Sequence, residues 1–235
     1  MGALRDLSVS QQVGLLFVAL FGLLALVTLV GSVVALREGT DADLAKRQGF
    51  ARDLGAVWVA SVLFWTAWVA GPLVSTLLFG VVSFIALREL ITLTHTRRAD
   101  HRSLLLAFFV VLPAQYLLVA QRHFDLFSVF IPVYVFLAIP VVSAFGNDPQ
   151  RFLERTAKIQ WGIMVCVYGI SHAPALLLLD LPNYTERGAF LVIFLVAVVA
   201  IAQIAQESAS RQLRRRPVAR AISRSFSWRA WGIGI

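Results

Sequence analysis

Three cations recur along one stretch of the chain at helical spacing. Arg151, Arg155 and Lys158 are four and three residues apart, so a helix would present all three on one face. The planar guanidinium of arginine grips a phosphate through two hydrogen bonds, and lysine adds a point charge. The pattern predicts a face that binds the phosphate of a substrate. The alternative is that these residues anchor a membrane span on its cytoplasmic side, with Glu154 as a local partner.

A second group of polar side chains lies within long apolar stretches. Gln160 and His172 fall in one stretch, and Gln206 follows Gln203 by three residues in another. Because a polar group at membrane depth is a candidate functional group, we predict a polar site in the membrane at Gln160, His172 and Gln206. For His172 the alternative is a ring satisfied by a freed backbone carbonyl or by interfacial water.

The residues alone predict no metal site. Magnesium needs hard oxygen ligands, usually one or two carboxylates, and the acidic residues between positions 13 and 206 are confined to loops and to the ends of apolar stretches. A glycine-rich phosphate loop, a zinc-binding pattern and a Gly-x-Ser-x-Gly motif are also absent from the sequence. We expect no nucleic-acid partner, because anionic lipid lies nearer to the basic C-terminal tail.

The elements that must position these residues are membrane helices. Of the 235 residues, 59% are hydrophobic and only 14% are charged, whereas a soluble domain carries about 25% charged residues. A bilayer core needs about 20 apolar helical residues. Apolar stretches of that order are residues 13–36, 103–120, 126–144, 159–179 and 188–206. A further stretch, 54–87, is long enough for two helices, and Gly71 and Pro72 at its middle predict a tight helical hairpin.

The basic residues predict the orientation. With seven helices, all but three of the 21 lysines and arginines lie on one side, the exceptions being Arg5, Arg122 and Arg187. Basic residues gather on the cytoplasmic side of a membrane. We therefore expect an all-α polytopic membrane protein of about seven transmembrane helices, with the N-terminus outside and the C-terminus inside. Residues 1–206 are the expected transmembrane domain, and residues 207–235 are a basic cytoplasmic tail.

Four motifs carry a family resemblance. They are Leu-Arg-Glu-Leu from Leu87 with Thr-Leu-Thr from Thr92, Phe-Ile-Pro-Val-Tyr from Phe130, Arg-Phe-Leu-Glu-Arg-Thr-Ala-Lys-Ile-Gln-Trp-Gly from Arg151, and Ser-His-Ala-Pro-Ala from Ser171. Over roughly residues 54–206 the chain resembles the bacterial subgroup of the phosphatidate cytidylyltransferase (CDP-diacylglycerol synthase) family.

This resemblance implies a multi-pass protein of the bacterial inner membrane that acts in phospholipid biosynthesis. Members of the family make CDP-diacylglycerol and pyrophosphate from CTP and phosphatidate, and Mg²⁺ is their expected cofactor. The resemblance also implies that Arg151, Arg155 and Lys158 face a phosphate-bearing substrate.

The chain departs from the family pattern in its last part. The family has Gln-x-Ser-Asp-x-x-Gln in a helix and then Ser-x-x-Lys-Thr-x-Glu-Gly, but here Gln203 stands at the aspartate and Phe226 at the lysine, while Gln206 keeps the final glutamine of the first motif. The chain stops at Ile235, before the family's further helices and signature, so the resemblance implies a diverged and truncated catalytic part. Glutamine offers magnesium no anionic oxygen and phenylalanine carries no charge, and the loss of such groups removes orders of magnitude in rate.

Three interpretations follow, and none assigns a catalytic residue. The first is a phosphatidate cytidylyltransferase-like membrane protein that binds phosphatidate and CTP, with no magnesium ligands recognised in this chain. The second is a non-catalytic membrane protein that binds anionic phospholipid, a full-length relative or a second copy of itself. The third is a truncated gene product without a selected role.

Overall fold

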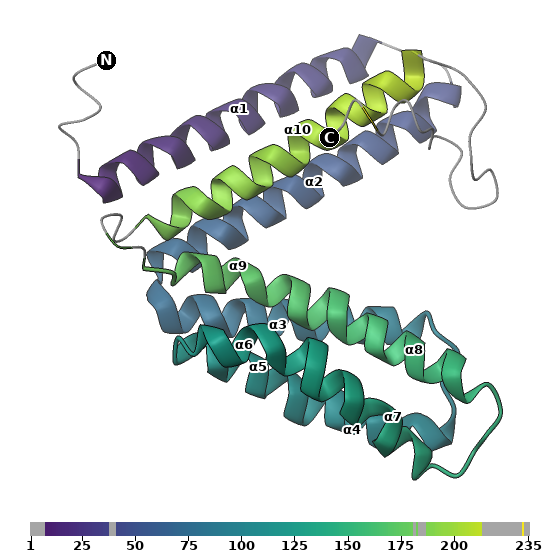
Figure 1. Ribbon diagram of the computed structural model, residues 1–235. Helices are drawn as coiled ribbons and strands as arrows, with labels where there is room; N and C mark the ends of the chain where they lie inside the picture. The colour runs from purple at the N-terminus through teal and green to yellow at the C-terminus, as the bar shows by residue number, and fades with distance from the viewer. Residues whose placement is uncertain (1–7, 38–40, 181, 183–186, 213–231, 233–235) are drawn as a thin grey trace. The chain divides into compact units, whose positions relative to one another are not determined.

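The computed structural model describes residues 8–37, 41–180, 182, 187–212 and 232, and every regular element in these ranges is helical (Figure 1). The expectation of an all-α fold is confirmed for this part of the chain. The helices are α1 (Val9–Arg37), α2 (Asp41–Val69), α3 (Gly71–Thr92), α4 (His101–Leu106), α5 (Leu112–Ala120), α6 (Phe124–Val129), α7 (Phe136–Ala144), α8 (Phe152–Gly162), α9 (Ile170–Leu177) and α10 (Gly188–Gln212). The chain divides into two units, residues 1–187 and 188–235.

Three pairs of short helices are continuous rods joined by π-helical turns. These turns are Ala107–Val111 between α4 and α5, Phe130–Val135 between α6 and α7, and Ile163–Gly169 between α8 and α9. Wide turns of this kind are rare and mark a local distortion of the backbone bonding pattern. Pro132 lies inside the second turn, and its ring removes one backbone donor from the rod.

The hairpin predicted in the long apolar stretch is confirmed. Gly71 has φ +86°, a left-handed conformation that glycine adopts without steric cost. Pro72 stands in the first turn of α3, where its missing N–H needs no partner. α2 packs against α3. α2 begins at Asp41 rather than near residue 54. Residues 41–53 include three alanines and two arginines, which are good helix formers, and continue the helix as a polar extension.

Five described segments are long and apolar enough to cross a membrane. They are Val9–Val33, Gly71–Thr92, Arg98–Ala120, Phe124–Ala144 and Phe152–Leu177. The other two predicted spans are α2, whose N-terminal part is polar, and α10, whose apolar part is the shorter segment Gly188–Gln203. The described part of the chain is therefore that of an all-α membrane protein. The number of seven spans and the orientation with the N-terminus outside stay predictions.

α3 packs against α2, α5, α8 and α9 within the first unit. Its Leu87 is almost fully buried. Gly162, at the end of α8, allows a close approach to α3, since a Cβ atom there would lie 3.0 Å from Leu90 Cδ2 and 3.3 Å from Leu87 Cδ1. This packing holds α8 beside the C-terminal end of α3 and so fixes the loops at that end.

The second unit is described through α10. This helix continues through residue 206, the expected end of the transmembrane domain, and ends at Gln212. Apart from Gly232, the rest of the predicted basic tail lies outside the described residues.

Candidate functional site

Two loops and the start of α8 meet at one end of the first unit. We name this region the loop end and define it as residues 93–102, 145–151 and 152–158. The guanidinium of Arg102 donates to the carbonyl of Phe145 at 3.4 Å. A Cβ atom on Gly146 would come within 2.6 Å of the Ala99 carbonyl oxygen, so only glycine fits there without a backbone shift. The two loops, both predicted to be cytoplasmic, are thus packed against each other.

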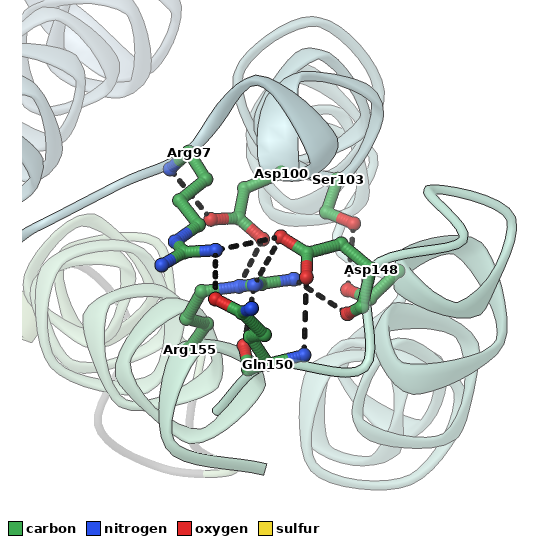
Figure 2. A network of polar contacts seen from close by, with 7 residues as sticks. Arg97, Asp100, Ser103, Asp148, Gln150 and Arg155 are labelled. Carbon is green, nitrogen blue, oxygen red and sulfur yellow. Dashed lines mark hydrogen bonds and ion pairs between the residues drawn. The ribbon is translucent and has the colours of Figure 1, made fainter. Parts of the chain in front are cut away.

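Arg155 is the centre of an ion-pair network in the loop end (Figure 2). Its side chain is only 6% exposed, and its Nε donates to Asp100 Oδ1 at 3.0 Å. Its Nη1 donates to Asp148 Oδ2 at 2.8 Å and to the Gln150 carbonyl at 2.6 Å, and its Nη2 donates to the Asp148 carbonyl at 3.1 Å. Four of the five N–H groups of this guanidinium therefore have partners inside the protein.

Arg97 completes the network. It lies in the same loop as Asp100 and contacts Asp148 and Gln150 of the second loop. Its backbone N–H donates to Asp100 Oδ2 at 2.9 Å, and its Nη1 donates to Gln150 Oε1 at 2.8 Å and lies 3.3 Å from Asp148 Oδ2. The charges of two arginines and two aspartates therefore balance. Buried charges are tolerated when they are paired and hydrogen-bonded in this way, so the network stabilises the geometry of both loops.

Asp148 makes the stability of the loop end depend on pH in the acidic range. The backbone N–H of Gln150, followed by Arg97 and Arg155, lowers the pKa of the Asp148 carboxyl below its usual value. A carboxyl with a lowered pKa stabilises the fold above its unfolded-state pKa of about 4 and loses that effect as the pH falls through its folded-state pKa. We expect the thermal unfolding midpoint in detergent to fall less between about pH 6 and pH 3 in Asp148→Asn than in the unmodified chain. Equal falls in both proteins would contradict this role.

The structure separates the three predicted phosphate-binding cations. Arg155 does not share the solvent exposure of the other two, because Asp100 and Asp148 hold its guanidinium inside the protein. Arg151 and Lys158 are 78% and 40% exposed and both lie beside Glu154. The distance from Lys158 Nζ to Glu154 Oε1 is 2.6 Å, and that from Arg151 Nε to Glu154 Oε2 is 3.9 Å. Phosphate binding by these residues stays a prediction.

Gln160 has a structural partner within the membrane rods. Its Nε2 donates to the Phe136 carbonyl at 2.7 Å, the oxygen whose helical donor would have been the N–H that Pro140 lacks. A second side chain of the same rod makes an equivalent contact. Tyr168 Oη donates to the Ser128 carbonyl at 3.1 Å, and Pro132 stands four residues after Ser128. The rod of α8 and α9 thus satisfies two carbonyls that prolines free in its neighbour.

His172 is half-buried among aromatic rings. Its Nδ1 lies 2.7 Å from the Tyr168 carbonyl, and its ring centroid lies 4.6 Å from that of Tyr168 and 4.9 Å from that of Phe127. The ring is therefore satisfied by a carbonyl, although not the one that Pro174 frees. His172 is about 18 Å from Gln160 along the rod, so the two do not form one polar site, and Gln206 lies in the second unit.

Sequence analysis missed the acidic half of the network, Asp100 and Asp148, and a buried amide, Gln115. Gln115 is fully buried, its Nε2 donates to Ser171 Oγ at 3.2 Å, and its Oε1 has no protein partner. A polar residue in an apolar stretch was a usable signal for Gln115. For the two aspartates the sequence signal is weaker, since they are single acidic residues in two separate loops.

The described residues show no recognisable group of magnesium ligands, and the magnesium ion that the resemblance implies stays a prediction. They contain no group of three or more His, Cys, Asp or Glu side chains that could hold a metal. The carboxylates of Asp100 and Asp148 bind Arg155. Gln203, at the family's aspartate position, is an exposed amide on α10, and Phe226 lies outside the described residues.

Comparison with known proteins covers most of the chain. The model of a family described as the cytidylyltransferase family matches residues 50–228, a range that includes the loop end. "Uncharacterized protein YnbB" of Escherichia coli (strain K12) is 34% identical over 208 residues, which are 87% of this chain and 65% of that relative. The chain therefore spans slightly less than two thirds of that relative's length. No solved structure matches the chain.

Proposed function

The chain belongs to the cytidylyltransferase family, and from this premise we propose that it is a phosphatidate cytidylyltransferase-like protein of phospholipid biosynthesis. In this proposal the phosphate of phosphatidate binds at the loop end, beside Arg151 and Lys158.

The exposure of Arg151 and Lys158 next to the buried Arg155 is the observation that supports this proposal. Arg151 and Lys158 are solvent-accessible, whereas the guanidinium of Arg155 is paired with carboxylates inside the protein. Arg155 also donates to the carbonyl of Gln150, the residue before Arg151. The backbone of Arg151 is left-handed, with φ +51°. Arg155 is therefore a positioning residue that sets the start of α8, and the two exposed cations are left to contact a headgroup.

The family reaction explains why cations are needed at the lipid phosphate. A phosphate oxygen of phosphatidate attacks the α-phosphorus of CTP, a new phosphoanhydride bond forms and pyrophosphate leaves. Two anions must approach each other, so fixed positive groups that neutralise and orient them lower the barrier. Arg151 and Lys158 would supply this for the lipid phosphate. The proposal assigns no residue to CTP and no step to a metal ion.

A second candidate function is a non-catalytic membrane protein that binds anionic phospholipid, alone or with a full-length relative. The amide of Gln203 at the family's aspartate position favours it, because an amide gives a magnesium ion no anionic oxygen. Both candidates share the lipid phosphate at the loop end, and they differ in whether this chain transfers the cytidylyl group.

The binding step is tested with the double variant Arg151→Gln and Lys158→Gln. Each basic residue near a headgroup contributes about 1 kcal/mol to binding of anionic lipid, so the loss of two is expected to lower phosphatidate binding in native mass spectrometry about thirty-fold. Arg122→Gln is the control, because Arg122 pairs with Asp180 at the opposite end of the rods. Unchanged phosphatidate binding in the double variant would refute the proposed site.

The catalytic step is tested by CDP-diacylglycerol formation from labelled CTP and phosphatidate. The chain is purified in detergent with magnesium, and the sample is checked for a co-purified host cytidylyltransferase. Product above background would support the enzyme. A folded sample that binds phosphatidate but gives no product would support the second candidate.

A further inference from the structure

The rod of α4 and α5 exposes two arginines at its beginning and apolar side chains just beyond them. Arg98 lies in the 3₁₀ turn Arg98–Asp100 that leads into α4, and Arg102 lies in the first turn of α4. We propose that this face is a second lipid site, at which the two arginines bind the phosphate of an anionic phospholipid of the surrounding bilayer. The site is separate from the one proposed on α8, and the lipid that it binds is not a substrate.

The charges of the two arginines are not balanced by carboxylates. Both residues are exposed, and among the described ion pairs none joins Arg98 or Arg102 to an acidic side chain. Asp100, which lies between them in the sequence, is buried and bound to Arg155. Like charges four residues apart on a helix repel each other. An anion that contacts both guanidinium groups relieves this repulsion.

The position of α4 in the bundle directs this face outward. Ser103 is fully buried, and its hydroxyl lies 2.8 Å from that of Ser143 on α7. Ser103 therefore marks the side of α4 that faces the bundle, and the exposed Arg102 lies outside it. The guanidinium of Arg102 also donates to the Phe145 carbonyl at 3.4 Å. This bond holds the arginine at the surface of the loop end.

Exposed apolar residues farther along the rod place the arginines at headgroup depth. The segment Arg98–Ala120 is long and apolar enough to cross a membrane. Within it, Leu105 is 43% exposed and Phe109 is 68% exposed, so both face acyl chains in a bilayer. They lie about 5 and 10 Å beyond Arg102 along the rod. The guanidinium groups are therefore at the level of the lipid phosphates, which arginine binds through two hydrogen bonds.

Net charge determines which class of lipid this face binds. Phosphatidylglycerol has a net negative charge, whereas the ammonium group of phosphatidylcholine balances the charge of its phosphate. Basic residues close to the membrane surface gain free energy from anionic lipid. Two arginines without carboxylate partners therefore favour an anionic lipid over a zwitterionic one.

The test is native mass spectrometry of the full chain in micelles that contain equal amounts of phosphatidylglycerol and phosphatidylcholine. We expect Arg98→Gln combined with Arg102→Gln to weaken the first phosphatidylglycerol adduct about thirty-fold. The matched control is Arg151→Gln combined with Lys158→Gln, which removes the same charge from α8. It should retain this adduct, because Glu154 already offsets those two cations. Equal losses in both double variants would show a general effect of net charge and would overturn the site.

Single substitutions at Arg98 separate lipid binding from folding. None of the described hydrogen bonds or ion pairs of this loop involves the Arg98 side chain, so Arg98→Gln leaves the fold intact. It should weaken the adduct about five-fold, whereas Arg98→Lys keeps the charge and should restore most of the binding. An unchanged adduct in Arg98→Gln would refute the part of Arg98 in the site.

Inorganic phosphate distinguishes a lipid from a soluble anion. In excess, it offers the arginines the same phosphate chemistry without acyl chains, and it should leave the phosphatidylglycerol adduct in place. Displacement of the adduct by inorganic phosphate would overturn the assignment to a lipid. None of these outcomes bears on phosphatidate binding at α8, which the variant of Arg151 and Lys158 tests by itself.

Discussion

Replacement of Arg155 by alanine is expected to lower the free energy of unfolding by about 3–5 kcal/mol. The change leaves Asp100, which is 3% exposed, without its counter-charge and leaves the Asp148 and Gln150 carbonyls without their donor. An unpaired buried carboxylate costs far more than an exposed ion pair contributes. The measurement is the folded fraction in detergent micelles as the fraction of denaturing detergent is raised. A loss below about 1 kcal/mol would contradict the central role of Arg155.

Two companion variants separate charge from geometry. Arg155→Lys keeps the charge but loses the planar guanidinium that binds Asp100 and Asp148 together. We therefore expect its free energy of unfolding to lie between those of the unmodified chain and of the alanine variant. The double change Arg155→Met and Asp100→Asn removes both charges. It should cost less than the sum of its single changes, because neither partner is left buried and charged. Additive losses would show that the two side chains act separately.

The inward position of Arg155 illustrates what the sequence could not predict. Spacing places Arg151, Arg155 and Lys158 near one side of a helix, but it does not say which part of that side faces the bundle. That depends on Asp100, 55 residues away along the chain, and on how closely two loops pack. The sequence does carry one usable hint, because each of the two loops that meet here contains an aspartate, and buried arginines need such partners.

Features with local causes were predicted well. The break between α2 and α3 follows from Gly71 and Pro72, whose backbone preferences act within two residues. The helical character of the apolar stretches follows from the need to satisfy backbone groups in a membrane. The start of α2 at Asp41 was not predicted, because hydropathy marks where a membrane span ends and not where a helix ends.

The bond of Gln160 to the Phe136 carbonyl follows from the backbone donors that prolines remove. Polar groups at membrane depth are candidates for function, but each proline inside a helix also frees one carbonyl that needs a donor. The rod of α6 and α7 contains Pro132 and Pro140, and the neighbouring rod provides Tyr168 and Gln160. The sequence shows that donors are needed, and only the packed structure shows which side chains provide them.

Substitution of Gln160 by leucine is therefore expected to cost about 1–2 kcal/mol of stability in the unmodified chain. The change leaves the Phe136 carbonyl, now bonded by Gln160 Nε2 at 2.7 Å, without its side-chain donor. The loss should nearly disappear when Pro140→Ala is already present, because residue 140 then supplies its own N–H to Phe136. Unfolding of the four proteins of this cycle in mixed micelles gives the coupling energy directly.

The second proline of the same rod provides an independent repeat of the cycle. Tyr168→Phe removes only the hydroxyl that donates to the Ser128 carbonyl at 3.1 Å, and Pro132→Ala restores the N–H that this carbonyl lacks. Two favourable couplings would show that the rod of α8 and α9 is held against its neighbour by carbonyls that proline frees. A loss for Gln160→Leu that is equal with and without Pro140 would instead mean that the glutamine stabilises the protein through another contact, and its place among the functional candidates would have to be reopened.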